Sequence, residues 1–266
     1  MAVRLSWQMS EEGEMTKIKF CGLTRPVDIE YANLLRPDYV GFVLTKSRRQ
    51  ISTAMAREMR RQLDPRIPAV GVFAGEDPDL MLYYVDMEII QAIQLHGIGT
   101  DGTQLNGARA EGVQVRGSRL LEPKDAQEAS FENLIQYLKE RTQVPVIKAV
   151  SFPKRTESSA ADTCNIASEP QVNSEIQRQL ETGADYLLFD QGRGGSGQVF
   201  DWDLIPEKTA KPFFLAGGIG PDNARAAIER FHPYCLDCSS GLETGGYKDF
   251  EKMKRMINLV RGYRNG

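Results

Sequence analysis

"DYVGFVLTKSRRQISTAMAREMRRQLDPRIPAVGVF", residues 38–73, holds the pattern that decides the fold. An apolar run rich in β-branched and aromatic residues fills 38–44, and a second such run fills 68–73. Between them, residues 53–63 form a longer amphipathic stretch, and Ser52 stands before it as a helix-starting residue. A strand, a helix and a further strand in this order predict two parallel strands joined by a crossover helix.

The same unit recurs along the whole chain. Strand-like runs occupy residues 17–21, 38–44, 68–73, 90–95, 144–150, 185–190, 212–217 and 234–239. Helix-like stretches occupy 26–35, 53–63, 132–142, 221–230 and 249–263, with Pro26 and Pro221 expected as first helical residues. The strand runs are apolar on both faces, as in a sheet covered by helices on both sides. Eight units in about 250 residues favour a closed (β/α)8 barrel, the TIM barrel.

An open doubly wound α/β sheet is the alternative fold. Such a sheet usually carries a nucleotide-binding loop after its first strand, and "CGLTRP" at residues 21–26 is not G-x-G-x-x-G. The barrel is therefore the preferred prediction, as a single domain over residues 16–266. Residues 1–15 are expected to be a disordered N-terminal lead.

Two connections are too long for a simple barrel. They cover residues 97–127 and 151–175 and follow the fourth and fifth strand-like runs. In a barrel, loops that follow strands project from the face where active sites are built. The first is rich in glycine and the second in Ser, Ala and Asp, so solvated additions are favoured over lids that close on a ligand.

Composition and charge exclude several classes of protein. The 266 residues are 41% hydrophobic, which suffices for a large core, and the formal net charge is -3. This charge argues against the broad positive surface of a nucleic-acid-binding protein, although a local site for a small anion stays open. No apolar run approaches the roughly 18 residues of a membrane span, and the N-terminal stretch does not resemble a signal peptide, so we expect a cytoplasmic location.

The four cysteines of the chain suit a reducing compartment. Cys235 and Cys238 have C-x-x-C spacing, but in a strand positions three apart point to opposite faces. His96 and His232 are the only histidines. We therefore expect no metal site.

Candidate catalytic residues stand at the ends of the strand-like runs, where a barrel places its active site. Cys21 ends the first run and Asp190 ends the sixth. Each alone is more often structural, the thiol as a small buried hydrophobe and the carboxyl as a helix cap. Together, a thiolate and a protonated carboxyl could remove and donate protons across a barrel mouth. His96, at the end of the fourth run, belongs to the same set of strand ends.

Glycine-rich turns follow the sixth, seventh and eighth runs. Loops after strands seven and eight are the usual phosphate site of a barrel, because backbone N–H groups there can cradle an anion. The sequence predicts a substrate that carries phosphate, bound at the turns "QGRGGSG" (191–197), "LAGGIGPDN" (215–223) and "DCSSGLETGG" (237–246).

The basic cluster "TKSRRQIS", residues 45–52, follows the second run. It is either a solvated loop or an arginine clamp for a carboxylate, since a guanidinium group can bind a carboxylate with two hydrogen bonds. Spacing alone does not distinguish Arg48 from Arg49 in that role.

These motifs together resemble the phosphoribosylanthranilate isomerase family of tryptophan biosynthesis, nearly end to end. The resemblance rests on "KFCGLTRPVD", "DYVGFVLTKSRRQIS", "VGVF", "IQLHG", "LLFDQGRGGSGQVFDW", "LAGGIGPDN" and "DCSSGLETGGYKD", in the family's order. It implies a (β/α)8 barrel that converts N-(5-phosphoribosyl)anthranilate to 1-(2-carboxyphenylamino)-1-deoxyribulose 5-phosphate by an Amadori rearrangement. The resemblance implies no cofactor or metal, and a monomer or homodimer.

The resemblance also implies roles for individual residues. Cys21 would be the general base that takes the C2 proton, and Asp190 the general acid that protonates the ring oxygen. Arg49 would bind the anthranilate carboxylate. The three glycine-rich loops would hold the phosphate, at Gly194, Gly195, Gly197, Gly217, Gly218, Ser239, Ser240 and Gly241. Asp237 would lie near the reacting centre, and His96 among the substrate-binding residues.

The chain departs from the family's pattern after the sixth run. Gln191 follows the expected acid, and Gln198 and Val199 replace the usual Lys and Thr. Two alternatives therefore stay open. One is the related histidine-pathway Amadori isomerase, whose usual catalytic pair is two aspartates, and the other is a barrel that binds a phosphorylated ligand without catalysis.

Overall fold

A computed structural model of the chain describes residues 15–96, 131–151, 180–190, 202, 205–206 and 209–264. The predicted lead at 1–15 and the two long loops lie outside these residues, apart from Met15 and Ser151. The strands are β1 (Lys17–Cys21), β2 (Tyr39–Val43), β3 (Ala69–Phe73), β4 (Ala92–Leu95), β5 (Val146–Ser151), β6 (Tyr186–Asp190), β7 (Phe213–Leu215), β8 (Cys235–Cys238), β9 (Glu243–Thr244) and β10 (Tyr247–Lys248). The helices are α1 (Pro26–Leu35), α2 (Thr53–Gln62), α3 (Pro78–Asp86), α5 (Phe131–Arg141), α7 (Ala224–Phe231), the 3-10 helix η3 (Ser240–Leu242) and α8 (Phe250–Arg264).

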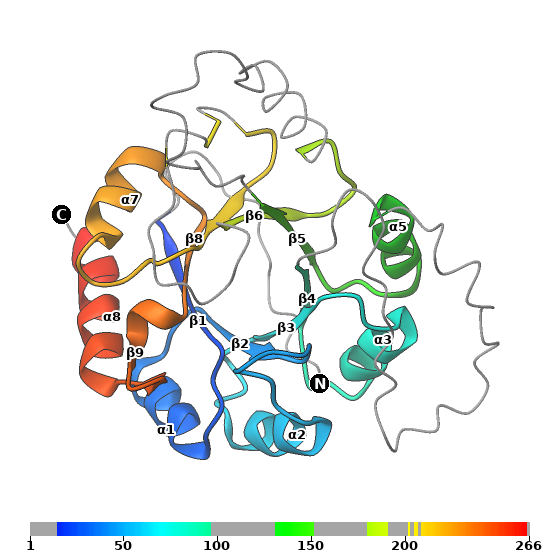
Figure 1. The fold of residues 1–266 in the computed structure, drawn as a ribbon, viewed down its shortest axis with the longest axis horizontal. Helices are drawn as coiled ribbons and strands as arrows, with labels where there is room; N and C mark the ends of the chain where they lie inside the picture. Colours follow the sequence, from blue (N-terminus) through cyan, green and yellow to red (C-terminus); the bar gives the residue numbers. More distant parts are fainter. Residues whose placement is uncertain are drawn as a thin grey trace, which may run out of the picture. The chain divides into compact units, whose positions relative to one another are not determined.

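Strands β1 to β8 follow one another in chain order around a closed barrel (Figure 1). Each strand-like run predicted from the sequence coincides with one of the strands β1 to β8, and the ends differ by at most two residues. The (β/α)8 prediction is confirmed, and the closed order excludes the open doubly wound sheet.

The first of two compact units in the chain contains the described residues from Phe20 to Lys148. Its strands pair in parallel, with Val40 opposite Ala69 between β2 and β3, and Val70 opposite Ala92 between β3 and β4. Helices α1, α2 and α3 lie outside the ring of strands (Figure 1). β2 and β3 are buried along their whole length, as the apolar runs of the sequence require of strands covered on both faces.

The second unit contains the described residues from Ala149 onward, together with the beginning of β1. β6, β7 and β8 pair in parallel, with Leu187 opposite Phe213 between β6 and β7. The rings of Tyr186, Phe214 and Tyr234 pack on one another with centroid separations of 4.8 to 5.7 Å. Helices α7 and α8 pack side by side in this unit (Figure 1).

Two helices differ from the sequence prediction. The helix expected from Pro221 begins three residues later, at Ala224, and residues 221–223 form a turn. The reason is that the Asn223 side chain accepts a hydrogen bond from the Gly220 N–H of the preceding loop. Helix α3 was not among the predicted stretches. Its start is nevertheless conventional, since the Asp77 carboxylate accepts from the Asp79 N–H at 2.9 Å and Pro78 is the first helical residue.

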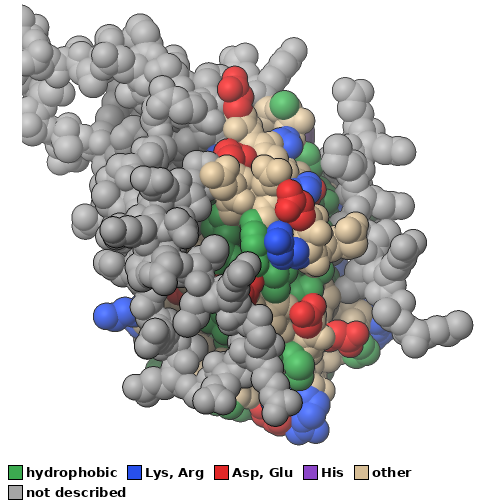
Figure 2. Space-filling view, turned by 90° about the vertical axis from the view of Figure 1, so that its right-hand side faces the viewer, with side chains coloured by type: hydrophobic (Ala, Val, Ile, Leu, Met, Phe, Trp, Pro, Cys, Tyr) green, Lys and Arg blue, Asp and Glu red, His purple; other side chains and the backbone are tan. Residues whose placement is uncertain are grey.

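The described surface mixes both signs of charge. In Figure 2, acidic and basic side chains are interspersed on the face in view, as the small net charge suggests. Among the described residues, no helix combines the length and the apolar composition needed to cross a bilayer.

Candidate active site

Cys21 is the last residue of β1, as the sequence predicted, and its side chain packs against Val43 and Val72. Val43 is likewise the last residue of β2, so the thiol lies in an apolar cluster at the ends of the strands. Gly22 follows with φ of 73°, and its N–H donates to the Gly41 carbonyl at 2.9 Å. Glycine adopts this φ without steric cost, so the chain turns directly after the thiol.

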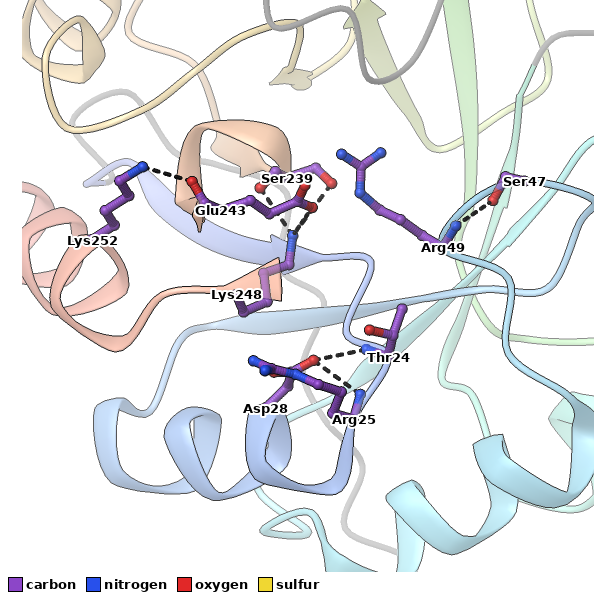
Figure 3. Close-up of polar contacts among 9 residues, drawn as sticks. All are labelled: Thr24, Arg25, Asp28, Ser47, Arg49, Ser239, Glu243, Lys248 and Lys252. Atoms are coloured by element: carbon purple, nitrogen blue, oxygen red, sulfur yellow. Dashed lines mark hydrogen bonds and ion pairs between the residues drawn. The ribbon is translucent and has the colours of Figure 1, made fainter. Parts of the chain in front are cut away.

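The turn from β1 into α1 is held by the Asp28 carboxylate, which is fully buried. Oδ2 accepts from the backbone N–H groups of Thr24 at 2.9 Å and Arg25 at 3.0 Å (Figure 3). Oδ1 accepts from the Arg25 guanidinium at 2.7 and 3.0 Å. One buried side chain thus fixes the segment that follows Cys21.

Asp190 is the last residue of β6, again as predicted, and only 8% of it is exposed. The four residues before it, Tyr-Leu-Leu-Phe, are all buried. The carboxyl therefore stands at the end of an apolar strand.

The two arginines after β2 differ in exposure. Arg48 is exposed, whereas Arg49 is half-buried. The backbone N–H of Arg49 donates to the Ser47 hydroxyl at 3.1 Å, and Figure 3 shows its side chain extending from this loop. The Ile51 N–H donates to the Val43 carbonyl at 3.0 Å, so the basic loop folds back on the end of its own strand. Arg49 is therefore the less exposed of the two arginines.

His96 directly follows β4, and its N–H donates to the Phe73 carbonyl at 2.8 Å. The backbone of His96 thus extends the pairing of β4 with β3 by one residue. Its side chain is half-buried.

The loop after β7 carries Gly217 and Gly218, both half-buried and with φ of 81° and 74°. The Asn223 side chain closes this loop: its Nδ2 donates to the Gly218 carbonyl at 3.1 Å, and its Oδ1 accepts from the Gly220 N–H at 2.9 Å. Asn223 therefore fixes the direction of the peptide groups before α7.

The loop after β8 contains Ser239, Ser240 and Gly241, all half-buried. A Cβ atom added to Gly241 would collide with the Ile219 carbonyl oxygen and lie 3.0 Å from the Gly220 Cα. Only glycine permits this approach, so the loops after β7 and β8 are in backbone contact. Two of the three segments predicted to bind phosphate are thus adjacent.

Asp237, in β8, forms a buried ion pair with Lys19 of β1. The Lys19 Nζ lies 3.0 Å from Asp237 Oδ2, and the exposed fractions of the two side chains are 0% and 6%. Within the described residues, Oδ1 of Asp237 has no hydrogen-bond partner.

Cys235 and Cys238 lie on β8 with both thiols buried. In the described part of the chain, no three His, Cys, Asp or Glu side chains are grouped so as to hold a metal ion.

The comparisons with known proteins place this geometry in a family. A family model described as N-(5'-phosphoribosyl)anthranilate (PRA) isomerase matches residues 132–259. The N-(5'-phosphoribosyl)anthranilate isomerase of Endomicrobium trichonymphae is 35% identical over 251 residues, which are 93% of this chain and 99% of the relative. The chain belongs to the N-(5'-phosphoribosyl)anthranilate isomerase family.

Solved structures of this isomerase family agree with the fold. The phosphoribosyl anthranilate isomerase from Thermotoga maritima is similar with a TM-score of 0.65 and 29% identity, over 93% of this chain and 100% of that one. A phosphoribosyl anthranilate isomerase in complex with reduced 1-(o-carboxyphenylamino)-1-deoxyribulose 5-phosphate has a TM-score of 0.60 and 27% identity, with the same coverage.

The structure of this isomerase family member describes most of the predicted site residues. Gly194, Gly195 and Gly197, as well as Gln198 and Val199, lie outside the described residues. The other predicted residues all lie in, or in the loop that follows, one of the strands β1, β2, β4, β6, β7 and β8.

Sequence reasoning missed three buried charged side chains that contact predicted site residues or the segment after one of them, namely Lys19, Asp28 and Lys248. Lys19 carried a signal, because alternate strand residues share a face and Lys19 is two positions before Cys21. The sequence also contains a signal for Lys248, because the two glycines before "YK" predict a tight hairpin whose second strand contains this lysine. Asp28 looked like any acidic residue in a first helical turn.

Proposed function

We propose that this chain catalyses the Amadori rearrangement of N-(5-phosphoribosyl)anthranilate to 1-(2-carboxyphenylamino)-1-deoxyribulose 5-phosphate, with Asp190 as general acid and Cys21 as general base. The observation that carries the proposal is the combination of family membership with a cysteine and an aspartate as the last residues of β1 and β6. Active sites of (β/α)8 barrels are built at the carboxyl ends of the strands.

The chemistry needs two proton transfers. Asp190 donates a proton to the ring oxygen as the C1–O bond of the ribose breaks, and the aniline nitrogen supplies the electron pair, which leaves an iminium ion. The iminium ion acidifies the C2 proton, so the Cys21 thiolate can remove it to give an enolamine. This intermediate then becomes the ketone as C1 gains a proton and the C2 hydroxyl loses one, which restores the proton that the carboxyl donated. A carboxyl and a thiol suffice for these steps.

The remaining assignments concern binding. In this proposal Arg49 holds the anthranilate carboxylate, and His96 and Asp237 contact the substrate near the reacting carbons. The phosphate is held by backbone N–H groups of Gly217, Gly218 and the 239–241 loop, together with those of Gly194, Gly195 and Gly197. The proposed enzyme acts in the cytoplasm without a metal or cofactor, as a monomer or homodimer.

The acid and base are tested by Cys21→Ala and Asp190→Asn. We expect kcat to fall by about 10²- to 10⁴-fold in each variant, because each removes one proton-transfer group. Circular dichroism should show an intact barrel. Cys235→Ala, which removes a buried thiol from β8, is the matched control and should retain activity. Full activity of either site variant would reject the assignment.

The function itself is tested by growth of a tryptophan auxotroph that lacks the isomerase. Rescue by the wild-type gene, but not by the Cys21→Ala gene, supports catalysis and rejects a barrel that only binds a phosphorylated ligand. An assay of the purified protein with the histidine-pathway aminoaldose should show no comparable turnover, since that reaction commonly uses two aspartates.

A further inference from the structure

Lys248 is a buried lysine that contacts the loop after β8. Only 4% of the residue is exposed. Its Nζ donates to the Ser239 carbonyl at 2.9 Å, to the Ser239 hydroxyl at 3.5 Å and to Glu243 Oε1 at 3.0 Å (Figure 3). The ammonium group is thus shared between the carboxylate that balances its charge and the first residue of a loop proposed to bind phosphate.

A hairpin places Lys248 there. β9 and β10 are antiparallel, with Lys248 directly opposite Glu243, and they are joined by Gly245 and Gly246 with φ of 59° and 86°. Two positive φ values are what a two-residue hairpin loop requires, and glycine supplies them at no steric cost. The Lys252 Nζ anchors the same hairpin by donating to the Glu243 carbonyl at 2.6 Å.

The Ser239 carbonyl is held from two sides. It accepts from Lys248 and also from the Leu242 N–H at 3.1 Å, so both of its lone pairs have donors. No cis peptide bond occurs in the described part of the chain. In a planar trans peptide the C=O and the following N–H point in opposite directions. Fixing the Ser239 carbonyl toward Lys248 therefore aims the Ser240 N–H away from Lys248.

We propose that Lys248 is a positioning residue for phosphate binding: it fixes the Ser239–Ser240 peptide so that the Ser240 N–H points at the phosphate of the substrate. The inference rests on the proposed function, which assigns the phosphate to this loop. The Lys248 ammonium does not itself bind the phosphate, because its donors are directed at Ser239 and Glu243.

The adjacent loop makes this orientation consequential. Gly241 is in contact with the backbone of Ile219 and Gly220, so the 239–241 segment cannot shift toward the loop after β7. Rotation of the Ser239–Ser240 peptide needs no such shift, and the Lys248 hydrogen bond opposes it. Loss of Lys248 should misdirect one N–H group without removing the loop.

The experiment uses inorganic phosphate as a probe, measured as a competitive inhibitor of the full-length enzyme. Lys248→Met removes the donors but leaves the buried Glu243 carboxylate without its cation, so Lys248→Met/Glu243→Gln is prepared beside it. We expect the inhibition constant of phosphate and the KM of the substrate to rise about tenfold in both variants, the amount that one lost hydrogen bond to a charged group can account for. The kcat should change less than about threefold, because the phosphate does not react.

Two further variants separate positioning from general stability. Lys248→Arg keeps a cation that can donate to both partners and should restore most of the phosphate affinity. Lys252→Met is the matched control: it also removes a lysine that donates to a backbone carbonyl, but that carbonyl belongs to Glu243. It should leave the inhibition constant unchanged.

The outcomes are distinct. If wild-type enzyme turns over substrate and Lys248→Met/Glu243→Gln keeps the wild-type inhibition constant, the positioning role is wrong, whatever happens to the melting temperature. An equal rise in the Lys252→Met variant would also overturn it, because the effect would then be that of a loosened hairpin. If wild-type protein shows no turnover, the proposed function fails, and this inference fails with it for a different and recognisable reason.

Discussion

At the residue scale, the Lys19–Asp237 pair is the clearest case of a polar contact that stability alone does not explain. Both side chains are almost fully buried, with 3.0 Å between nitrogen and oxygen. Removing two charges from water costs several kcal/mol for each ion, so such a pair often stabilises a fold no more than apolar side chains of the same volume would. Lys19 stands two positions before Cys21 on β1, so the two side chains share a face of the strand.

The pair makes a prediction about single and double substitutions. Lys19→Met should lower the free energy of unfolding by about 3 to 5 kcal/mol, because it leaves the Asp237 carboxylate buried without its cation. Lys19→Met/Asp237→Leu should recover most of that loss. Urea denaturation followed by circular dichroism measures both.

Lys17→Met provides the control on the same strand. Lys17 is half-buried and donates to the Tyr234 hydroxyl at 3.1 Å, so its loss should cost about 1 kcal/mol. If Lys19→Met is no more destabilising than Lys17→Met, the buried carboxylate does not depend on its partner.

The structure confirms the predicted positions of Cys21 and Asp190 at the ends of β1 and β6. These positions could be predicted because each residue ends an apolar run, and strand ends can be read from the sequence. Lys19 and Lys248 depend on partners 218 and 9 residues away along the chain. A contact of this kind depends on the packing of elements against one another, which periodicity does not encode.

At the element scale, the turn between β1 and α1 depends on one carboxylate. Asp28 accepts four hydrogen bonds, two from backbone N–H groups and two from the Arg25 guanidinium. Without it, two buried or half-buried N–H groups at the start of α1 lose their acceptor.

We expect Asp28→Ala to lower the free energy of unfolding by about 2 to 3 kcal/mol, the cost of losing a charged helix-start acceptor. Glu30→Ala, an exposed change in the same helix, should cost less than about 0.5 kcal/mol. Chemical denaturation of the two variants in parallel provides the comparison, and equal midpoints would show that the turn forms without Asp28.

The connection between α2 and β3 contains a carboxylate with a strongly shifted titration. The Arg66 guanidinium donates to both oxygens of Asp64, at 2.6 to 3.2 Å, and the Arg66 N–H donates at 2.9 Å. These bonds lower the pKa of Asp64 from 3.8 to about 2.

The sign of this shift fixes its pH dependence. The folded pKa lies below the unfolded one, so the contribution of Asp64 is complete above about pH 4 and disappears as the pH falls toward 2. Arg66→Met should raise the pKa of Asp64 back toward 3.8, which an NMR titration of its carboxyl carbon measures. Since 69% of the Arg66 side chain is exposed, 1 M salt should weaken the shift in the wild type. A titration midpoint that does not move in Arg66→Met would refute the assignment to this pair.

The start of a helix was predictable where the residue before it caps the helix. It was missed where a side chain near the start forms hydrogen bonds with the preceding loop instead. The α2 start at Thr53 follows from Ser52, whose hydroxyl accepts from the Met55 N–H. The α7 start does not follow from Pro221, because Asn223 uses its amide to close the glycine loop.

At the scale of the whole molecule, a closed parallel barrel leaves no sheet edge exposed, and its strands must pack at high density on both faces. Gly71 in β3 illustrates this density. A Cβ atom added there would lie 2.7 Å from the Ile90 Cδ1 and 2.8 Å from the Phe73 Cε2. Neither neighbour is backbone, but both belong to fully buried side chains that have little room to move.

Gly71→Ala should therefore destabilise the protein by about 1 to 3 kcal/mol through overpacking. The same substitution at Gly262 in α8 meets no atom within 4 Å and should instead stabilise by up to about 1 kcal/mol, because alanine loses less backbone entropy than glycine in a helix. At this chain length, about 1 kcal/mol corresponds to a change of about 2 to 4 °C in Tm, so calorimetry should find the two alanine variants on opposite sides of the wild type. A Gly71→Ala variant that melts at or above the wild-type temperature would mean that Ile90 and Phe73 can repack around the added methyl group, so that packing density at β3 does not exclude a larger residue.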